Sequence, residues 1–468
     1  MYIGVQLLLF VLMLPLALSW IAGDTLVLYP AEAGYGEFSA LLLIIHVFTS
    51  VRIVVLSTNL IDNIGQICFY TFIYIWIVLI PSMQMYQETW PLEVFVGVET
   101  NVFVLEIVAI SILAFEAGNW TKNSRRYFAF ESKAVVPKNA VIYLFFGGYS
   151  LSFTYFVLSI GDVSLLLGAR VNSYAAVFEN NTAKLVADAL FRTPIVVLCQ
   201  VFFSLFLAGM HRRVVMFWPM AFASTLMLLV SNFPTAQARG RIGSVLVAFI
   251  VIWIVHQRPR LARWFPTIMC AGVLIIFPLL SQTRRQVDWE SLSLGGVRQA
   301  YFQGSFDAYQ MLGVIIDYTN THGSQWGRQF LGALLFWVPR SVWPDKPIGT
   351  GAQVATDLGL SFTNLSAPLW SEAYINFGLI GVLVTFFALG RVSGAIGGAF
   401  LDKSGAHMIF GSFFVGFQIL LLRGDLMSSF TLLLPFMICV AAMFWKSERV
   451  SVFRMLANTG MKHAERDY

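Results

Sequence analysis

The sequence QICFYTFIYIWIVLIPSMQMY, residues 66–86, contains no charged residue over 21 consecutive positions. About 20 mostly apolar residues suffice for a helix to cross the hydrocarbon core of a bilayer. We therefore expect this stretch to be a membrane-spanning helix. The same rule predicts twelve spans, at roughly 3–22, 39–57, 66–86, 95–117, 140–160, 190–210, 214–231, 242–256, 265–281, 376–396, 408–422 and 429–445.

The composition of the whole chain agrees with this interpretation. Of 468 residues, 58% are hydrophobic and 12% are charged, and the mean hydropathy is +0.74. Soluble domains carry about 25% charged residues, so a soluble enzyme, a disordered chain and a secreted disulfide scaffold are excluded. The four cysteines lie within apolar runs, which predicts packing residues rather than disulfides or metal ligands. The fold class expected is an all-α polytopic membrane protein.

The distribution of Lys and Arg predicts the orientation. The first two loops on one side, around 23–38 and 87–94, contain acidic residues and no Lys or Arg, whereas 119–139 contains five basic residues. Cytoplasmic loops are enriched in Lys and Arg, so both termini are predicted to be cytoplasmic. The first span lacks a preceding basic residue and a cleavage site, which favours an uncleaved helix over a signal peptide.

One outer segment is much longer than the other connections. The expected divisions are nine spans in 1–281, a long outer loop at 282–375, three spans in 376–445 and a basic cytoplasmic tail at 446–468. Loops of this length are usually functional. Because this one interleaves Arg with Trp and Tyr, it suits a ligand that carries both anionic groups and flat sugar faces.

Other outer segments also carry cations near the ends of spans. Such cations are costly without a partner, so we expect several to converge on one anionic ligand. The candidates are Arg170, Arg239, Arg241, Arg284, Arg285, Arg340, Lys346 and Arg423. No cluster with metal-ligand spacing and no nucleotide-binding motif is present, so no metal and no cofactor are predicted. The small and scattered net charge of +5 gives no indication of nucleic-acid binding.

Four short segments resemble a known family. The run from Pro339 to Pro347, PRSVWPDKP, is similar to the P-R-x-x-W-P-x-K-P run of Wzy-type bacterial oligosaccharide repeat-unit polymerases, and EAYINFG at 372–378 resembles their E-x-Y-x-N-F-G. RVNSY at 170–174 and the basic turn at 238–241 are similar to two further motifs. The resemblance implies a GT-C-like fold of the branch that includes the O-antigen ligases.

The resemblance also implies an activity. A glycan would be transferred from undecaprenyl pyrophosphate to another lipid-linked unit at the outer face of the bacterial inner membrane, beside a chain-length-regulating co-polymerase. Glu372 is the expected general base, with Asp345, His322 and Asp425 as alternatives, and Arg340 would stabilise the leaving pyrophosphate. Tyr174, Trp343, Tyr374 and Asn376 join the expected cations in substrate binding.

Three alternatives remain open at this point. One is an O-antigen ligase with the same fold and a different acceptor. Another is a flippase for the lipid-linked sugar, which should line its central helices with cations. Arg52 and Arg391 lie well within spans, whereas the other cations lie in loops or at span ends, which favours an enzyme. The third is a non-catalytic scaffold.

Overall fold

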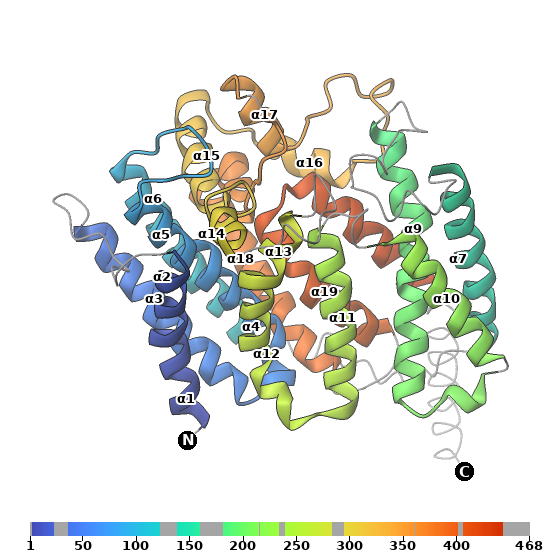
Figure 1. The fold of residues 1–468 in the computed structure, drawn as a ribbon. Coiled ribbons are helices and arrows are strands. Elements are labelled where there is room, and N and C mark those ends of the chain that lie inside the picture. Colours follow the sequence, from blue (N-terminus) through green and yellow to red (C-terminus); the bar gives the residue numbers. More distant parts are fainter. Residues whose placement is uncertain are drawn as a thin grey trace, which may run out of the picture.

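The computed structural model describes residues 2–22, 36–121, 138–159, 181–214, 216–233, 239–282, 294–360, 362–400 and 406–442. Within these ranges the structure is a bundle of helices (Figure 1). Its long helices are α3 (Gly36–Ser57), α6 (Val98–Trp120), α7 (Lys138–Ser159), α9 (Asn181–Leu207), α10 (Phe217–Ser231), α11 (Arg239–Gln257), α18 (Leu369–Ala399) and α19 (Ala406–Arg423).

Three of the apolar stretches are continuous helices that contain a π-helical turn. They are α1–η1–α2 (Tyr2–Leu8, Leu9–Met13, Leu14–Ala22), α4–η2–α5 (Leu60–Phe72, Ile73–Leu79, Ile80–Tyr86) and α12–η6–α13 (Phe265–Ala271, Gly272–Ile276, Phe277–Gln282).

Seven described segments are long and apolar enough to cross a membrane, so the protein is membrane-embedded. They are Tyr2–Ser19, Gly36–Ser57, Leu60–Tyr86, Val98–Trp120, Arg239–Gln257, Arg260–Leu279 and Leu369–Gly398. Five shorter apolar helices coincide with the remaining expected spans, at Val141–Thr154, Phe191–Leu207, Phe217–Ser231, His407–Arg423 and Leu426–Ala442. Twelve crossings therefore remain a prediction.

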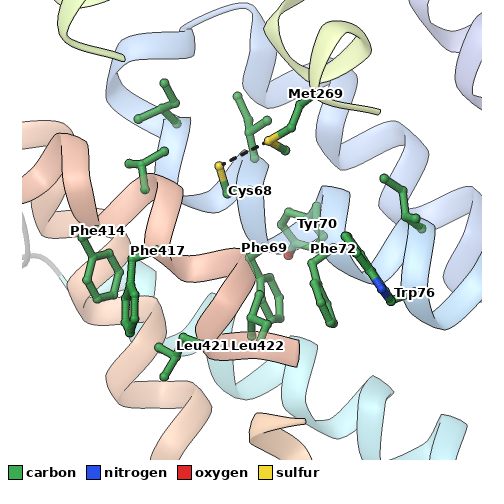
Figure 2. Packing of buried hydrophobic residues seen from close by; sticks show 14 of the residues in the cluster. Cys68, Phe69, Tyr70, Phe72, Trp76, Met269, Phe414, Phe417, Leu421 and Leu422 are labelled. Carbon is green, nitrogen blue, oxygen red and sulfur yellow. Dashed lines mark hydrogen bonds between the residues drawn. The ribbon is translucent and has the colours of Figure 1, made fainter. Parts of the chain in front are cut away.

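The stretch quoted first forms the centre of the bundle. Every residue from 64 to 85 is buried, which explains why this helix is apolar around its whole circumference. Phe72 stacks on Trp76 with ring centroids 4.8 Å apart, and Phe69 lies 6.2 Å from Trp370 of α18. Figure 2 shows Phe69, Phe72 and Trp76 along one face, with Phe414 and Phe417 of α19 nearby. Cys68, Cys199 and Cys270 are buried free thiols, as expected for packing residues.

Four short helices form one end of the bundle. They are α14 (Leu294–Tyr301), α15 (Ala308–His322), α16 (Arg328–Leu334) and α17 (Thr350–Asp357). Figure 1 shows α15, α16 and α17 together at the top, with the N-terminus at the opposite end. The connection between α5 and α6 lies at this end too, because Gln310 of α15 donates to the carbonyls of Leu92 and Val94 over 2.8 Å. We call this end of the bundle the α15–α17 end.

Helix α18 differs from the expected span in two ways. It begins at Leu369, before the boundary expected at 376, because Trp370 is buried and donates to Ser111 of α6 over 2.7 Å. It is also broken at Phe377 and Gly378, where the backbone leaves the helical region. Gly378 has φ 59° and ψ −148°, a conformation open essentially to glycine alone. The break separates the first two turns, which carry Glu372, from the remainder of the helix.

Candidate functional site: a cation–carboxylate cluster

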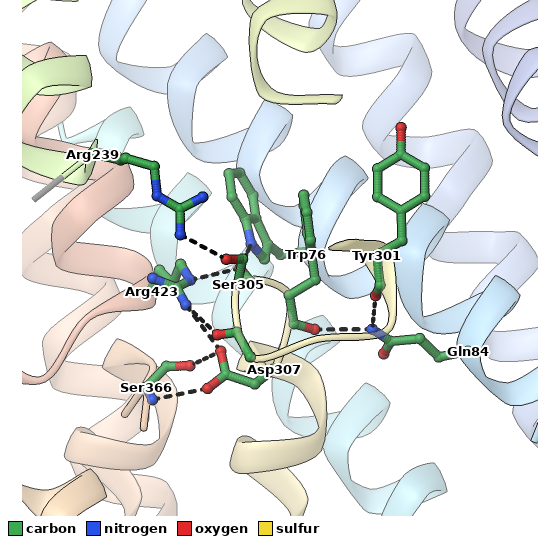
Figure 3. A network of polar contacts seen from close by, with 10 residues as sticks. Trp76, Gln84, Arg239, Tyr301, Ser305, Asp307, Ser366 and Arg423 are labelled. Carbon is green, nitrogen blue, oxygen red and sulfur yellow. Dashed lines mark hydrogen bonds and ion pairs between the residues drawn. The ribbon is translucent and has the colours of Figure 1, made fainter. Parts of the chain in front are cut away.

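Two of the expected cations meet at the turn between α14 and α15. Arg423, at the end of α19, donates from Nε to the carbonyl of Ser305 (3.0 Å) and from Nη2 to that of Gly304 (2.8 Å). Arg239 donates to Ser305 Oγ over 3.1 Å and to the carbonyl of Phe277 over 3.1 Å. Figure 3 shows both side chains reaching this turn from the same side. Residues that are 184 positions apart in the sequence thus share one partner.

Asp307 completes this group and is a site residue that the sequence did not reveal. Its carboxylate lies 3.1 Å from Arg423 Nη2 and accepts hydrogen bonds from the backbone N–H (3.1 Å) and hydroxyl of Ser366. The Asp307 side chain is 1% exposed, against 24% for Arg423. A buried carboxylate needs such a partner. A lone Asp in an outer loop gives no sequence signal that distinguishes it from a solvated one.

Arg239 and Arg241 lie in the first turn of α11, although the sequence predicted them in a turn outside the span. A cation is unfavourable near the N-terminal end of a helix. For Arg239 this cost is offset by its two acceptors and by the ring of Phe277, whose centroid is 4.6 Å from the guanidinium carbon. Arg241 is half-buried.

Glu372 is almost completely buried, with 1% of its surface exposed. One carboxylate oxygen accepts from the hydroxyl of Thr350 over 2.8 Å, and the other accepts from the backbone N–H of Leu426 over 3.0 Å. Thr350 begins α17, Leu426 begins the last helix, and Glu372 itself lies in the first turn of α18. Three helix starts, each with a partial positive charge, therefore surround this one carboxylate.

Asp425, an alternative base in the sequence prediction, lies beside Glu372. It caps the last helix, because its Oδ1 accepts from the backbone N–H groups of Met427 (2.9 Å) and Ser428 (3.2 Å). It also accepts from the N–H of Thr350, whose hydroxyl donates to Glu372. Burial raises the pKa of Asp425, although these N–H donors act in the opposite direction. Asp425 keeps part of its surface exposed.

Tyr374 and Asn376 hold the first part of α18 against the neighbouring helices. The Asn376 amide donates to the carbonyl of Glu372 (2.7 Å) and accepts from the N–H of Gln329 in α16 (3.2 Å). The Tyr374 hydroxyl donates to Asn320 over 3.1 Å. Asn376 is buried and Tyr374 is half-buried. These contacts position the helix start that carries Glu372.

The motif at 339–347 forms a loop that is closed by its own cations. Arg340 donates to the carbonyls of Lys346 (2.7 Å), Pro344 and Pro347 (3.4 Å each). Lys346 donates to those of Phe336 (2.8 Å) and Val338 (2.9 Å). Trp343, half-buried, lies on the turn between them.

Lys346, expected in substrate binding, lies in a buried environment within this loop. The residue is 5% exposed, and burial lowers the pKa of its ammonium group, with the charge of Arg340 acting in the same direction. The ammonium group is occupied by carbonyls of its own loop and does not face the cluster around Ser305. Arg340 is exposed, but its described partners are likewise carbonyls of that loop.

Four expected site residues, Arg170, Tyr174, Arg284 and Arg285, lie outside the described residues, as does the basic tail. Among the residues that the structure describes, no three His, Cys, Asp or Glu side chains are grouped as metal ligands. No family model, curated protein or solved structure matches this chain.

Proposed function

We propose that the protein is a membrane glycosyltransferase that polymerises oligosaccharides carried on a lipid pyrophosphate. The observation that carries this proposal is the segment Arg423-Gly424-Asp425. Its first residue joins the cations at the 304–307 turn, and its last joins Glu372 and Thr350. Groups suited to an anionic leaving group and to an acceptor hydroxyl thereby lie on either side of a single glycine.

The cations would stabilise the pyrophosphate as it leaves. Arg423 donates from Nε and Nη2 to the turn before α15 and to Asp307, and both N–H groups of Nη1 have no partner among the described residues. An arginine fork of this kind suits phosphate oxygens. Fixed donors aimed at a developing anion are usually the largest single contribution to catalysis.

The carboxylate pair would take the proton of the acceptor hydroxyl. The acceptor oxygen forms the new glycosidic bond, the bond from the donor sugar to the pyrophosphate breaks, and the proton moves to a carboxylate. Asp425 is the member of the pair with exposed surface, whereas Glu372 is enclosed. We therefore assign proton acceptance to the pair, with Asp425 nearest the substrate and Glu372 holding it in place.

The resemblance of the 339–347 and 372–378 segments to polymerase motifs supports the same proposal. It implies a reaction at the outer face of the bacterial inner membrane. The distribution of Lys and Arg predicts that both termini are cytoplasmic, and the α15–α17 end would then face outward. The resemblance also suggests a chain-length-regulating co-polymerase as partner and undecaprenyl pyrophosphate as the lipid carrier.

The test uses purified protein and lipid-linked oligosaccharide isolated from membranes of the source cells. The wild-type protein should form a ladder of products on a gel and release lipid pyrophosphate. Glu372→Gln and Asp425→Asn should each lower the rate at least about a hundredfold, while Glu99→Gln, an exposed carboxylate of α6, should not. Absence of any ladder from wild-type protein, or normal ladders from both carboxylate variants, would contradict the proposal.

A further inference from the structure

A charged groove lies at the end of the bundle opposite the candidate site. It has a volume of about 310 Å³ and is lined by residues of two helix connections. They are Ser57–Asp62, between α3 and α4, and Arg258, Pro259, Ala262 and Arg263, between α11 and α12. The helix from Leu60 to Tyr86 separates this groove from the α15–α17 end by about 40 Å, at 1.5 Å per residue. The groove is therefore independent of the cluster around Arg423 and Glu372.

The groove lies at the depth of the lipid headgroups. Four membrane-spanning segments end at it, because Ser57 ends one, Leu60 begins the next, and Gln257 and Arg260 bound the other two. Aromatic residues lie at the same level, where Tyr2 packs edge-on against Trp264 with centroids 5.8 Å apart. Tyr and Trp are enriched at the membrane–water interface.

Three side chains give the groove a mixed charge. Arg258 and Arg263 lie in one connection, and Asp62 lies in the other. Among the described residues none of the three charged groups has a hydrogen bond or an ion pair, although Arg263 lies over the ring of Tyr2 at 5.7 Å. Arg258 follows α11 directly with φ 45°, a left-handed conformation that is rare for a bulky residue. These charges are available to a ligand.

We propose that this groove binds the headgroup of a phospholipid that carries both a phosphate and a primary ammonium, such as phosphatidylethanolamine. The two guanidinium groups suit the phosphate oxygens, and basic pockets between helix ends commonly hold lipid phosphates. Asp62 accepts hydrogen bonds from the ammonium, a contact that phosphatidylglycerol cannot make because it has no ammonium group. A quaternary ammonium has no N–H to donate, so phosphatidylcholine lacks this contact.

Native mass spectrometry of the full chain in detergent tests the proposal with dioleoyl phosphatidylethanolamine, phosphatidylcholine and phosphatidylglycerol. The wild-type protein should retain the ethanolamine lipid about threefold or more over the choline lipid. Arg258→Gln with Arg263→Gln should weaken retention about tenfold. Asp62→Asn should abolish the discrimination between ethanolamine and choline.

Arg260→Gln is the matched control, because Arg260 is exposed in the same connection and does not line the groove. Equal binding of the ethanolamine and choline lipids by wild-type protein would overturn the proposal. So would a preference for phosphatidylglycerol, or identical losses in the Arg260 variant and the double variant. Thermal unfolding without added lipid should be the same for all variants, since these side chains are exposed or half-buried.

Discussion

The expected substrate-binding cations divide into two pairs that the protein uses differently. Arg340 and Lys346 donate to carbonyls no more than ten positions away in the sequence, and they close a single loop. Arg239 and Arg423 bind partners 38 to 119 positions away, and they join α11, α19 and the turn before α15. The first pair stabilises a local fold, whereas the second assembles a site from separate helices.

The difference shows that a distinctive sequence motif and contacts between distant helices are separate properties. The run at 339–347 is the most specific stretch of the sequence, yet its buried lysine is occupied by its own loop. Arg423 stands in an ordinary R-G-D sequence, yet it pairs with a buried carboxylate. Substitutions in the two pairs should therefore have different consequences.

The largest effect is expected for Arg423→Met. This change leaves the carboxylate of Asp307, 1% exposed, without its cation. Removing one partner of a buried pair costs about 3–5 kcal/mol, and we expect about 3 kcal/mol because Arg423 is partly exposed. Loss of unfolding free energy in detergent measures the effect.

A second substitution shows whether the ion pair is the cause. Asp307→Asn in the Arg423→Met background removes the unpaired charge and keeps an acceptor for the Ser366 N–H, so most of the lost stability should return. Arg239→Met removes hydrogen bonds to the carbonyl of Phe277 and to the hydroxyl of Ser305 and should cost less, about 1 kcal/mol. Equal losses for Arg239→Met and Arg423→Met would mean that the ion pair with Asp307 is not the cause of the larger effect.

The sequence predicts the helices well because a segment that crosses the bilayer must be a helix of about 20 mostly apolar residues. Every residue from 64 to 85 is uncharged and buried. The described apolar helices follow the expected order. The break in α18 was not predicted, because Phe377 and Gly378 stand between two apolar helical segments of one continuous helix, Leu369–Ala399. A single glycine does not reveal its φ angle.

The sequence does not predict which side chains on different helices contact one another. Arg52 was identified as a cation within a span, but its partner Glu116, in α6, lies 64 positions away at 2.5 Å. Asp307 and Thr350 were missed for the same reason, since nothing local marks the partner of a distant side chain. The convergence of several cations on one anionic ligand stays a prediction. Among the described candidates, the structure brings Arg239 and Arg423 to the same turn.

An intermediate effect is expected for Lys346→Met. It leaves the carbonyls of Phe336 and Val338 without their donor. A buried unsatisfied group costs about 1–3 kcal/mol, and because Val338 is only half-buried we expect a total of about 2 kcal/mol. Arg340→Met removes contacts that are more exposed and should cost less than about 1 kcal/mol. Hydrogen exchange of the 336–347 amides should rise more in the lysine variant. The reverse order would mean that Arg340, and not Lys346, closes the loop.

The smallest effect, and the one with a defined pH dependence, is expected for Asp425→Asn. Asparagine caps a helix as well as aspartate, so the contacts with Met427 and Ser428 should persist. Because burial raises the pKa of Asp425, the folded wild-type protein binds this proton more tightly than the unfolded chain. Its contribution to stability is complete below the ordinary aspartate pKa of about 4 and is lost as the pH rises through the folded pKa. The variant has no such loss, so its advantage in unfolding temperature should grow from pH 4 towards neutral pH, while polymer formation is abolished.

If the N–H donors outweighed burial, the pKa of Asp425 would be lowered and the variant would become the less stable protein as the pH rises. That result would remove the reason for assigning a proton to the Glu372–Asp425 pair, and the cluster would then be only the junction of three helix starts.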